Sequence, residues 1–331
     1  MVHAIALVGA GRMGQCHAHH LASNPDIDFK YIVETNPDAA RRMVAAYGAI
    51  WESYEEVLKD ASVKGVVICS DTRQHLPQSM QALTAGKSVF CEKPIGLNLA
   101  DVRAARPDRN HPPFLLGLNR RFDPHIRNLV RRVHAGEIGK IESIRIVNHD
   151  PSSPPASFVK NSGGIFRDFT LHDLDLCRWI LDEPIAEVYA AGSCLIDEAY
   201  ADAGDFDTAR TLMKSRSGAL CAISNTRRSG CGYDQRLEVF GQWGRLAVDN
   251  LHESTLSKAD ISGSGRDRIH PHFMSRYEAS YREETVHFAD ILAGNARPLV
   301  TYDDGISALR LAEACMQSAH TNQSMNTYSE Q

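Results

Sequence analysis

A glycine-rich turn between an apolar run and a helical pattern constrains the fold of this chain more than any other feature. Residues 4–8 are apolar, the sequence GAGRMG follows directly, and a helical pattern continues through residue 21. A strand, a GxGxxG turn and a helix in this order are typical of dinucleotide binding. The phosphates would lie at the helix N-terminus, where free N–H groups and the helix dipole favour anions. We expect the cofactor contacts of this turn to be Gly9, Gly11, Arg12, Met13 and Gly14.

Each glycine has a separate expected role. Gly9 would allow the tight turn, Gly11 would let a pyrophosphate approach the backbone, and Gly14 would let the helix pack close to the strand. The next predicted strand, residues 29–33, ends in Glu34. An acid at this point accepts hydrogen bonds from a ribose diol and repels a 2′-phosphate, so it favours NAD over NADP. The alternative is that Glu34 is only the polar end of a strand.

Strands and helices alternate through the first 118 residues. Further helices are expected at residues 54–59, 77–85 and 99–105, and further strands at 65–69, 89–91 and 114–118. This alternation predicts an α/β fold with a doubly wound parallel sheet, the Rossmann arrangement. Ser70 and His75 follow the strand at 65–69, at the sheet edge that holds Gly9, so we expect them beside the nicotinamide ribose.

The sequence SVFCEKPI, residues 88–95, closes a buried strand with an acid, a base and a proline. In open parallel sheets ligands bind at the edge where the strands end. Lys93 is therefore either a solvated lysine at a strand end, as most lysines are, or a base at the mouth of a cofactor cleft. In the second interpretation Glu92 and Lys93 both contact the cofactor.

The pattern changes after residue 118. Runs with a period of two occupy residues 141–147, 188–195, 206–213, 220–226, 237–241 and 246–248, and helices are expected at 126–134, 275–292 and 306–318. The alternation predicts a large, mainly antiparallel sheet with one face covered. We therefore expect an NAD-binding domain over residues 1–118 and a second domain, built on this sheet, over residues 119–331.

A DFTLHDLD motif in the second half combines acids with a histidine. Asp168 and His172 are four residues apart and would share a helix face, with Asp175 three residues further. A histidine that titrates near neutral pH beside a carboxylate can move a substrate proton. One alternative is that Thr170 caps the helix and Asp173 favours its dipole. Another is a metal site, but an alcohol dehydrogenase needs only a base and a hydride acceptor, so we expect no metal.

Composition excludes several classes of partner. The net charge of -5 provides no basic field for nucleic acid. No apolar run approaches the roughly 20 residues that a membrane span requires. The eight cysteines form no CxxC pair, which indicates reduced, buried thiols. The first residues enter a strand pattern without a charged and apolar leader, so we expect a cytoplasmic protein.

The motifs GAGRMG, FCEKP, GLNRRFDP and GGIFRDFTLHDLD together resemble the Gfo/Idh/MocA oxidoreductases, and within them the inositol dehydrogenases. The resemblance covers nearly the whole chain. It implies a Rossmann domain followed by an α/β domain whose open sheet packs subunits into dimers or tetramers. It also implies oxidation of a secondary hydroxyl of a cyclic polyol or sugar, with myo-inositol or a related inositol as the first substrate to consider.

The resemblance also assigns roles to particular residues. Lys93 matches the family's catalytic lysine, with a cis bond to Pro94, and Asp168 and His172 match the pair beside the substrate hydroxyl. The positions that match contacts to other ring hydroxyls are Arg120, Asp175, Tyr233 and Tyr281. The residues before His75 depart from the family pattern, which leaves the exact substrate open. Two other functions stay open: an enzyme that uses bound NAD as a transient oxidant, and a binding module without catalysis.

Overall fold

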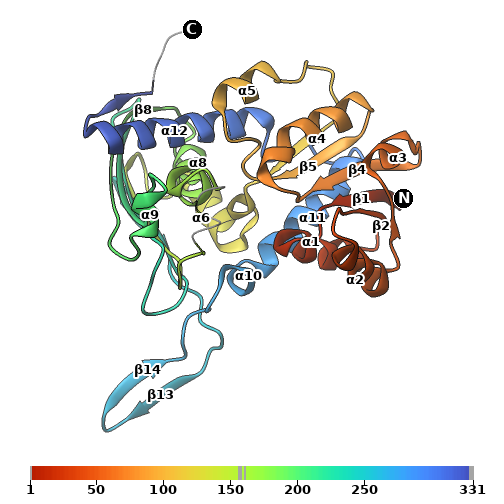
Figure 1. Ribbon diagram of the computed structural model, residues 1–331. Coiled ribbons are helices and arrows are strands. Elements are labelled where there is room, and N and C mark those ends of the chain that lie inside the picture. Colours follow the sequence, from red (N-terminus) through yellow and green to blue (C-terminus); the bar gives the residue numbers. More distant parts are fainter. Residues whose placement is uncertain (1, 156–158, 160–161, 328–331) are drawn as a thin grey trace. The chain divides into compact units, whose positions relative to one another are not determined.

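The computed structural model describes residues 2–155, 159 and 162–327, and the chain folds into two compact units (Figure 1). The first unit is Met1–Phe122 with Ala279–Ser307, and the second is Asp123–Glu278 with Ala308–Gln331. The first break lies close to the expected boundary at residue 118. Residues 279–307 differ from the expectation because they group with the first unit, not the second.

Packing explains why this late segment belongs to the first unit. Helix α11, Glu278–Leu292, contributes Phe288, which is fully buried. A Cβ atom on Gly65 would come within 2.9 Å of the Phe288 ring, so the glycine provides the room for this aromatic side chain. Phe288 also lies against Phe90, with ring centroids 5.7 Å apart. The helix therefore completes the core of the first sheet.

The first unit contains a six-stranded parallel sheet in the order β3-β2-β1-β4-β5-β6. Its strands are β1 His3–Val8, β2 Ile27–Val33, β3 Ile50–Trp51, β4 Val63–Ile68, β5 Ser88–Glu92 and β6 Phe114–Gly117. The chain order reverses between β1 and β4, and ligands bind at such a switch point in doubly wound sheets. All five residues of β5 are buried, as expected for a central strand covered on both faces.

Helices cover this sheet, and two of them differ from the sequence prediction. The helices are α1 Arg12–Ser23, α2 Pro37–Tyr47, α3 Tyr54–Lys59, α4 Thr72–Thr84 and α5 Leu99–Ala104. Helix α4 begins before residue 77, since the Asp71 side chain caps it by accepting the Arg73 N–H. His75 is therefore helical, and Pro77 lies inside the helix. Helix α2 was not predicted, although Asn36 caps it and Pro37 occupies its first turn.

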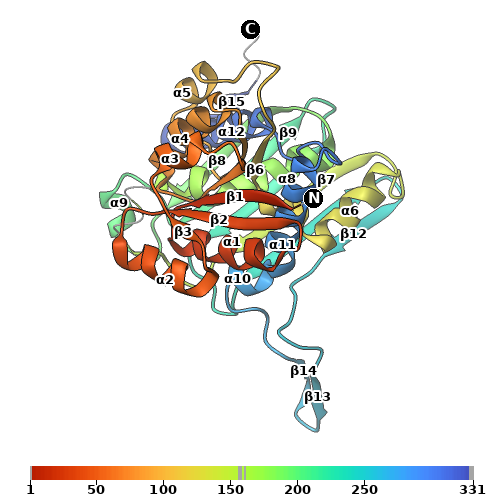
Figure 2. The same ribbon diagram turned by 90° about the vertical axis from the view of Figure 1, so that its right-hand side faces the viewer.

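The second unit contains a seven-stranded sheet in the order β12-β11-β7-β10-β9-β8-β15 (Figures 1 and 2). The strands are β7 Ile141–His149, β8 Ile185–Ser193, β9 Thr208–Ser215, β10 Leu220–Thr226, β11 Asp234–Gly241, β12 Gly244–Val248 and β15 Met325–Asn326. Strands β7 and β10 pair in parallel and the other neighbours are antiparallel. The expected mainly antiparallel sheet is therefore confirmed.

Helices pack on one face of this sheet. They are α6 Pro124–His134, α8 Leu171–Leu181 and α12 Tyr302–Thr321. The second unit also contains two short helices, α9 Ala199–Asp202 and α10 Phe273–Arg276. The opposite face is open and exposes large apolar side chains, including Tyr189, Leu212, Leu220 and Phe240. Alternate residues of each strand therefore face a covered core and an open surface.

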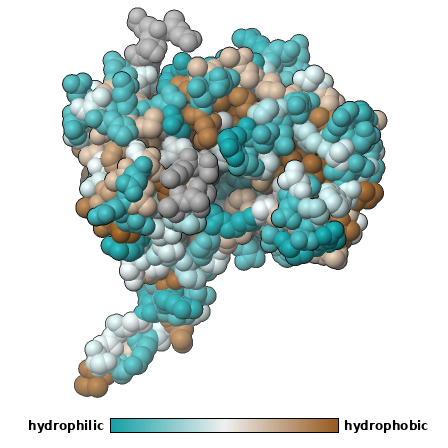
Figure 3. Space-filling view, viewed as in Figure 1, coloured by the Kyte–Doolittle hydropathy of each residue, from teal (hydrophilic) through white to brown (hydrophobic). Residues whose placement is uncertain are grey.

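A two-stranded hairpin that the sequence did not predict projects from the second unit (Figures 1 and 2). It consists of β13 Ser257–Asp260 and β14 Gly263–Arg266, and all of their residues are exposed. Figure 3 shows apolar surface at the tip of the hairpin, and the exposed Ile261 lies in the turn between β13 and β14. Within the described part of the chain, no helix combines the length and the apolar character that a membrane crossing requires.

Candidate functional site

The glycine turn combines two tightly packed positions with an open one. A Cβ atom on Gly9, whose φ is +96°, would lie 2.7 Å from the Cys69 carbonyl oxygen. A Cβ atom on Gly14 would lie 2.0 Å from the Gly9 carbonyl oxygen, so only glycine fits there. No atom lies within 4 Å of the corresponding point at Gly11. Because Arg12 and Met13 begin α1, this open backbone meets the helix N-terminus and fits a pyrophosphate.

Glu34 is tied to the glycine turn by its side chain. Oε2 accepts the Ala10 N–H at 2.6 Å, and Oε1 accepts the Asn36 N–H at 2.8 Å. Partial burial opposes ionisation, but these backbone hydrogen bonds outweigh it and lower the pKa of Glu34. The carboxylate is therefore charged at neutral pH and fixed beside the turn, an arrangement that fits a ribose diol and opposes a 2′-phosphate.

His75 lies beneath the sheet edge, with only 3% of its surface exposed. Its Nδ1 is 2.8 Å from the Pro94 carbonyl oxygen and its Nε2 is 3.1 Å from the Ser70 carbonyl oxygen. Burial lowers the pKa of this imidazole. The Ser70 hydroxyl donates to Gln78 Oε1 at 2.6 Å. His75 therefore joins the turn after Lys93 to the loop after β4 through backbone contacts.

Lys93 leaves β5 at the edge that carries the glycine turn, and its bond to Pro94 is cis, as expected. Glu92 precedes it and is 6% exposed. One Glu92 oxygen lies 2.7 Å from His17 Nε2, and the other accepts the Lys93 backbone N–H at 3.1 Å. Each carboxylate oxygen of Glu92 thus has a hydrogen-bond partner within the protein. The side chain of Lys93 is half-buried.

Two of the residues expected to contact substrate also belong to the first unit. Arg120 lies in the 3₁₀ helix Asn119–Phe122 and is 4% exposed. Tyr281 lies on α11, is equally well buried, and directs its ring toward His17 with centroids 5.8 Å apart. The structure therefore brings Tyr281 close to the buried partner of Glu92, a relationship that the sequence did not suggest.

The acid and histidine of the second motif lie on a continuous helical segment in the second unit. A π-helix, Phe166–Thr170, contains Asp168 and runs directly into α8, where His172 occupies the first turn. Asp168 Oδ2 accepts a hydrogen bond from Arg227 Nη1 at 2.9 Å. The Arg227 guanidinium also lies 5.1 Å from the centre of the Phe169 ring. Sequence reasoning missed Arg227, because nothing in the motif itself pointed to a residue 59 positions away.

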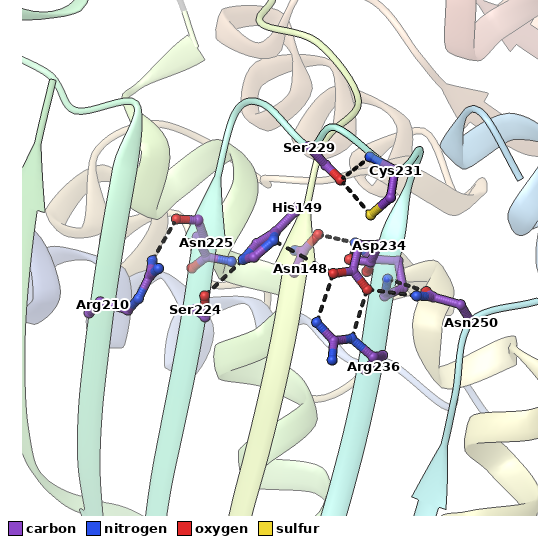
Figure 4. Close-up of polar contacts among 11 residues, drawn as sticks. Asn148, His149, Arg210, Ser224, Asn225, Ser229, Cys231, Asp234, Arg236 and Asn250 are labelled. Carbon is purple, nitrogen blue, oxygen red and sulfur yellow. Dashed lines mark hydrogen bonds and ion pairs between the residues drawn. The ribbon is translucent and has the colours of Figure 1, made fainter. Parts of the chain in front are cut away.

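A buried polar network fixes the start of α8 to the sheet, and it shows that the alternative of a Thr170 side-chain cap does not hold. Thr170 makes no side-chain cap, and its hydroxyl donates to Asn225 Oδ1 at 2.8 Å. Asp173 Oδ2 accepts N–H groups from Asn148 at 2.9 Å and Asn225 at 2.8 Å. The two asparagines are directly paired on β7 and β10 (Figure 4). His172 therefore lies between two residues that are anchored to the sheet.

The remaining predicted residues of the second unit are also buried. Asp175 is 1% exposed, on α8. Tyr233 is 5% exposed, and its ring lies 6.0 Å from that of Tyr277. Within residues 2–155, 159 and 162–327, no group of three or more His, Cys, Asp or Glu side chains is arranged to hold a metal ion.

Comparisons with known proteins identify both halves of the chain. Residues 3–106 match the family described as "Oxidoreductase family, NAD-binding Rossmann fold", and residues 126–247 match the "GFO/IDH/MocA C-terminal domain". The chain is 39% identical to the myo-inositol 2-dehydrogenase of Thermotoga maritima, with 97% of each chain covered. It is 38% identical to the inositol 2-dehydrogenase of Rhizobium meliloti, over 94% of this chain and 95% of the relative.

Solved structures agree with these relatives. A myo-inositol dehydrogenase from Corynebacterium glutamicum superposes with a TM-score of 0.93 at 35% identity, with both chains fully covered. A scyllo-inositol dehydrogenase from Lactobacillus casei, solved with NAD(H) and scyllo-inositol, gives a TM-score of 0.92 at 28% identity. That match covers 99% of this chain and 100% of the other.

Proposed function

Because the chain belongs to the Gfo/Idh/MocA oxidoreductase family, we propose that it oxidises one secondary hydroxyl group of an inositol or a related cyclic polyol, with NAD⁺ as the oxidant. The observation that carries the proposal is the position of Lys93 directly after β5 of the cofactor-binding sheet. Its backbone N–H is held there by a hydrogen bond to the Glu92 carboxylate. Relatives named inositol 2-dehydrogenase support the substrate class. Asp168, which accepts a hydrogen bond from Arg227, and His172 would supply the carboxylate and the base for the oxidation of a polyol.

The proposed mechanism assigns a role to each of these side chains. Bound NAD⁺ would supply the hydride acceptor. His172 removes the proton of the reacting hydroxyl, and Lys93 shares or relays that proton. Asp168 orients His172 or Lys93 and accepts a hydrogen bond from a neighbouring hydroxyl. The proposed contacts to the other ring hydroxyls are Arg120, Asp175, Tyr233 and Tyr281.

The polar character of these contacts supports a polyhydroxylated ring. A substrate that lacks one hydroxyl would leave a buried polar or charged group unpaired, so it is discriminated against strongly. We also propose that NAD⁺ is preferred over NADP⁺, because the ionised carboxylate of Glu34 is fixed next to the glycine turn.

A polyol screen with each cofactor tests the proposal. Purified protein is mixed with NAD⁺ or NADP⁺ and a panel of inositols, sugars and acyclic polyols, and reduced cofactor is followed by its absorbance. We expect NADH to form with one or more inositols. Conversion of the polyol without net NADH would instead indicate a transient oxidant role for bound NAD, and no conversion of any cyclic polyol would contradict the proposal.

We further propose that the protein assembles as a dimer or tetramer through the open face of the second sheet. Tyr189, Leu212 and Phe240 are 40%, 57% and 45% exposed on that face. The same sheet carries polar groups, including the Asp234–Arg236 ion pair and His149, whose Nδ1 lies 3.7 Å from Asp234 Oδ2 (Figure 4). Light scattering after gel filtration measures the mass directly. Leu212→Glu should shift an oligomer toward smaller species, and a monomeric wild-type protein would contradict the proposal.

A further inference from the structure

A buried histidine and carboxylate form a pair directly behind Lys93. His17 lies on α1, three residues after the last glycine of the turn, and its surface is 0% exposed. Its Nε2 is 2.7 Å from Glu92 Oε1. The imidazole is held from two sides, because the rings of Phe90 and Tyr281 meet it edge-on at 5.0 Å and 5.8 Å. Its orientation toward Glu92 is therefore fixed by packing as well as by the hydrogen bond.

Glu92 also forms a hydrogen bond with the backbone of Lys93. Its second oxygen accepts the Lys93 N–H at 3.1 Å, so one carboxylate bridges α1 and the residue that follows β5. The helix that begins at the glycine turn is thus joined to Lys93 through two hydrogen bonds. A shift of His17 or Glu92 would move the lysine relative to the cofactor-binding turn.

The distribution of charge around the pair supports this role. Glu284 on α11 is 0% exposed, and neither of its oxygens has a hydrogen-bond partner among the described residues. Burial, together with the negative charge of Glu92, raises the pKa of Glu284 well above 4.5. Burial also opposes ionisation of Glu92, but the His17 hydrogen bond and the charges of His17 and Lys93 lower its pKa. Of the two acids, Glu92 is therefore the more readily ionised, and it is the one whose carboxylate contacts the Lys93 backbone.

We propose that His17 and Glu92 are positioning residues that hold Lys93 in its reactive place relative to the cofactor-binding turn. The proposal rests on the function proposed above, in which Lys93 takes part in proton transfer. Neither residue touches the substrate in this account. Both act through the backbone and the local charge at Lys93.

Three variants test the proposal against a matched control. His17→Leu removes the donor to Glu92, and His17→Gln offers an amide N–H in its place. Glu92→Gln keeps an acceptor for the Lys93 N–H but removes the charge. Lys87→Ala is the control, because Lys87 is equally buried and bonds the Asp60 and Val63 carbonyls at the opposite end of β5.

The measurements are kcat and KM with the best polyol, the Kd of NAD⁺ by fluorescence titration, and Tm. We expect His17→Leu and Glu92→Gln to lower kcat by about 10- to 100-fold, since small misplacements of a reacting group have effects of this size. In His17→Leu the Kd of NAD⁺ should stay within about 3-fold, and His17→Gln should recover part of kcat. Lys87→Ala should lower Tm and leave kcat unchanged.

Two results would overturn the proposal, and they are distinguishable. If wild-type protein oxidises a polyol while His17→Leu and Glu92→Gln retain its kcat and only lose Tm as Lys87→Ala does, the pair is merely structural. If the wild-type protein converts no cyclic polyol, the proposed function fails and the positioning role fails with it.

Discussion

Arg227 donates a hydrogen bond from Nη1 to Oδ2 of Asp168 across 2.9 Å, and its side chain is only 2% exposed. The arginine follows the end of β10, whereas Asp168 lies in the π-helix before α8. The guanidinium also faces the Phe169 ring. The residue that follows β10 therefore sets the direction of the carboxylate that we propose to accept a hydrogen bond from the substrate.

Replacing Arg227 by Met should lower both the free energy of unfolding and kcat/KM. Removing one partner of a buried ion pair leaves the other charge uncompensated, which costs about 3–5 kcal/mol when burial is complete. Asp168 is 17% exposed, so we expect the lower end, about 3 kcal/mol, in urea unfolding. Arg227→Lys keeps the charge but not the planar fork, and should be intermediate. Unchanged stability and kcat/KM in Arg227→Met would contradict this role.

Glu34→Gln should weaken the preference for NAD⁺. The amide keeps one acceptor for the turn but removes the charge that repels a 2′-phosphate. Because like charges in contact cost several kcal/mol, the ratio of kcat/KM for NAD⁺ over NADP⁺ should fall by at least about 10-fold. The ratio is measured with a single polyol at saturation. A wild-type enzyme that already prefers NADP⁺ would refute the argument from Glu34.

Glu284→Met should stabilise the protein, and more so at higher pH. The pKa of Glu284 in the folded state is raised above its ordinary value of 4.5. As the pH rises, the carboxyl group therefore ionises first in the unfolded chain. The wild-type protein loses stability from about pH 4.5 upward, until the pH exceeds the raised pKa. The gain in Tm should therefore grow as the pH rises above 4.5. Glu284→Gln, which cannot titrate, should reproduce the pH trend with a smaller gain. A gain independent of pH would contradict a neutral buried acid.

Asn225→Ala should loosen the start of α8. The substitution removes the partner of Thr170 and one of the two amides that hold Asp173, all fully buried. We expect a loss of about 2–3 kcal/mol in urea unfolding, because a hydrogen bond to a buried charge is among the stronger ones. Val147→Ala, on the open side of β7, serves as the control for a simple strand substitution. Equal losses in the two variants would argue against the network.

Much of the fold was accessible from the sequence, because local patterns determine it. The strand, glycine turn and helix at the N-terminus, and the period-two runs of the second half, give the correct sheets. The helix bounds that were wrong depended on caps. The sequence predicts that this helix begins at Pro77. In the structure Asp71 caps α4, so the helix begins at Thr72.

The contacts of the site were less accessible, since they join residues far apart in the chain. The motif indicated only that Asp173 could lie in the first turn of a helix, where it does lie, but its carboxylate also accepts hydrogen bonds from two asparagines of the sheet. Likewise His17 on α1 and Glu284 on α11 both interact with Glu92 at the end of β5, although the three residues are far apart in the chain. No periodicity in a single segment contains that information.

Lys93→Ala tests the central claim most directly. The variant is assayed for turnover of the best polyol with NAD⁺, and for NAD⁺ binding by fluorescence titration. If Lys93 takes part in proton transfer, kcat should fall by at least about 100-fold while the Kd of NAD⁺ stays within about 3-fold. A variant that retained near wild-type kcat would contradict the proposed mechanism.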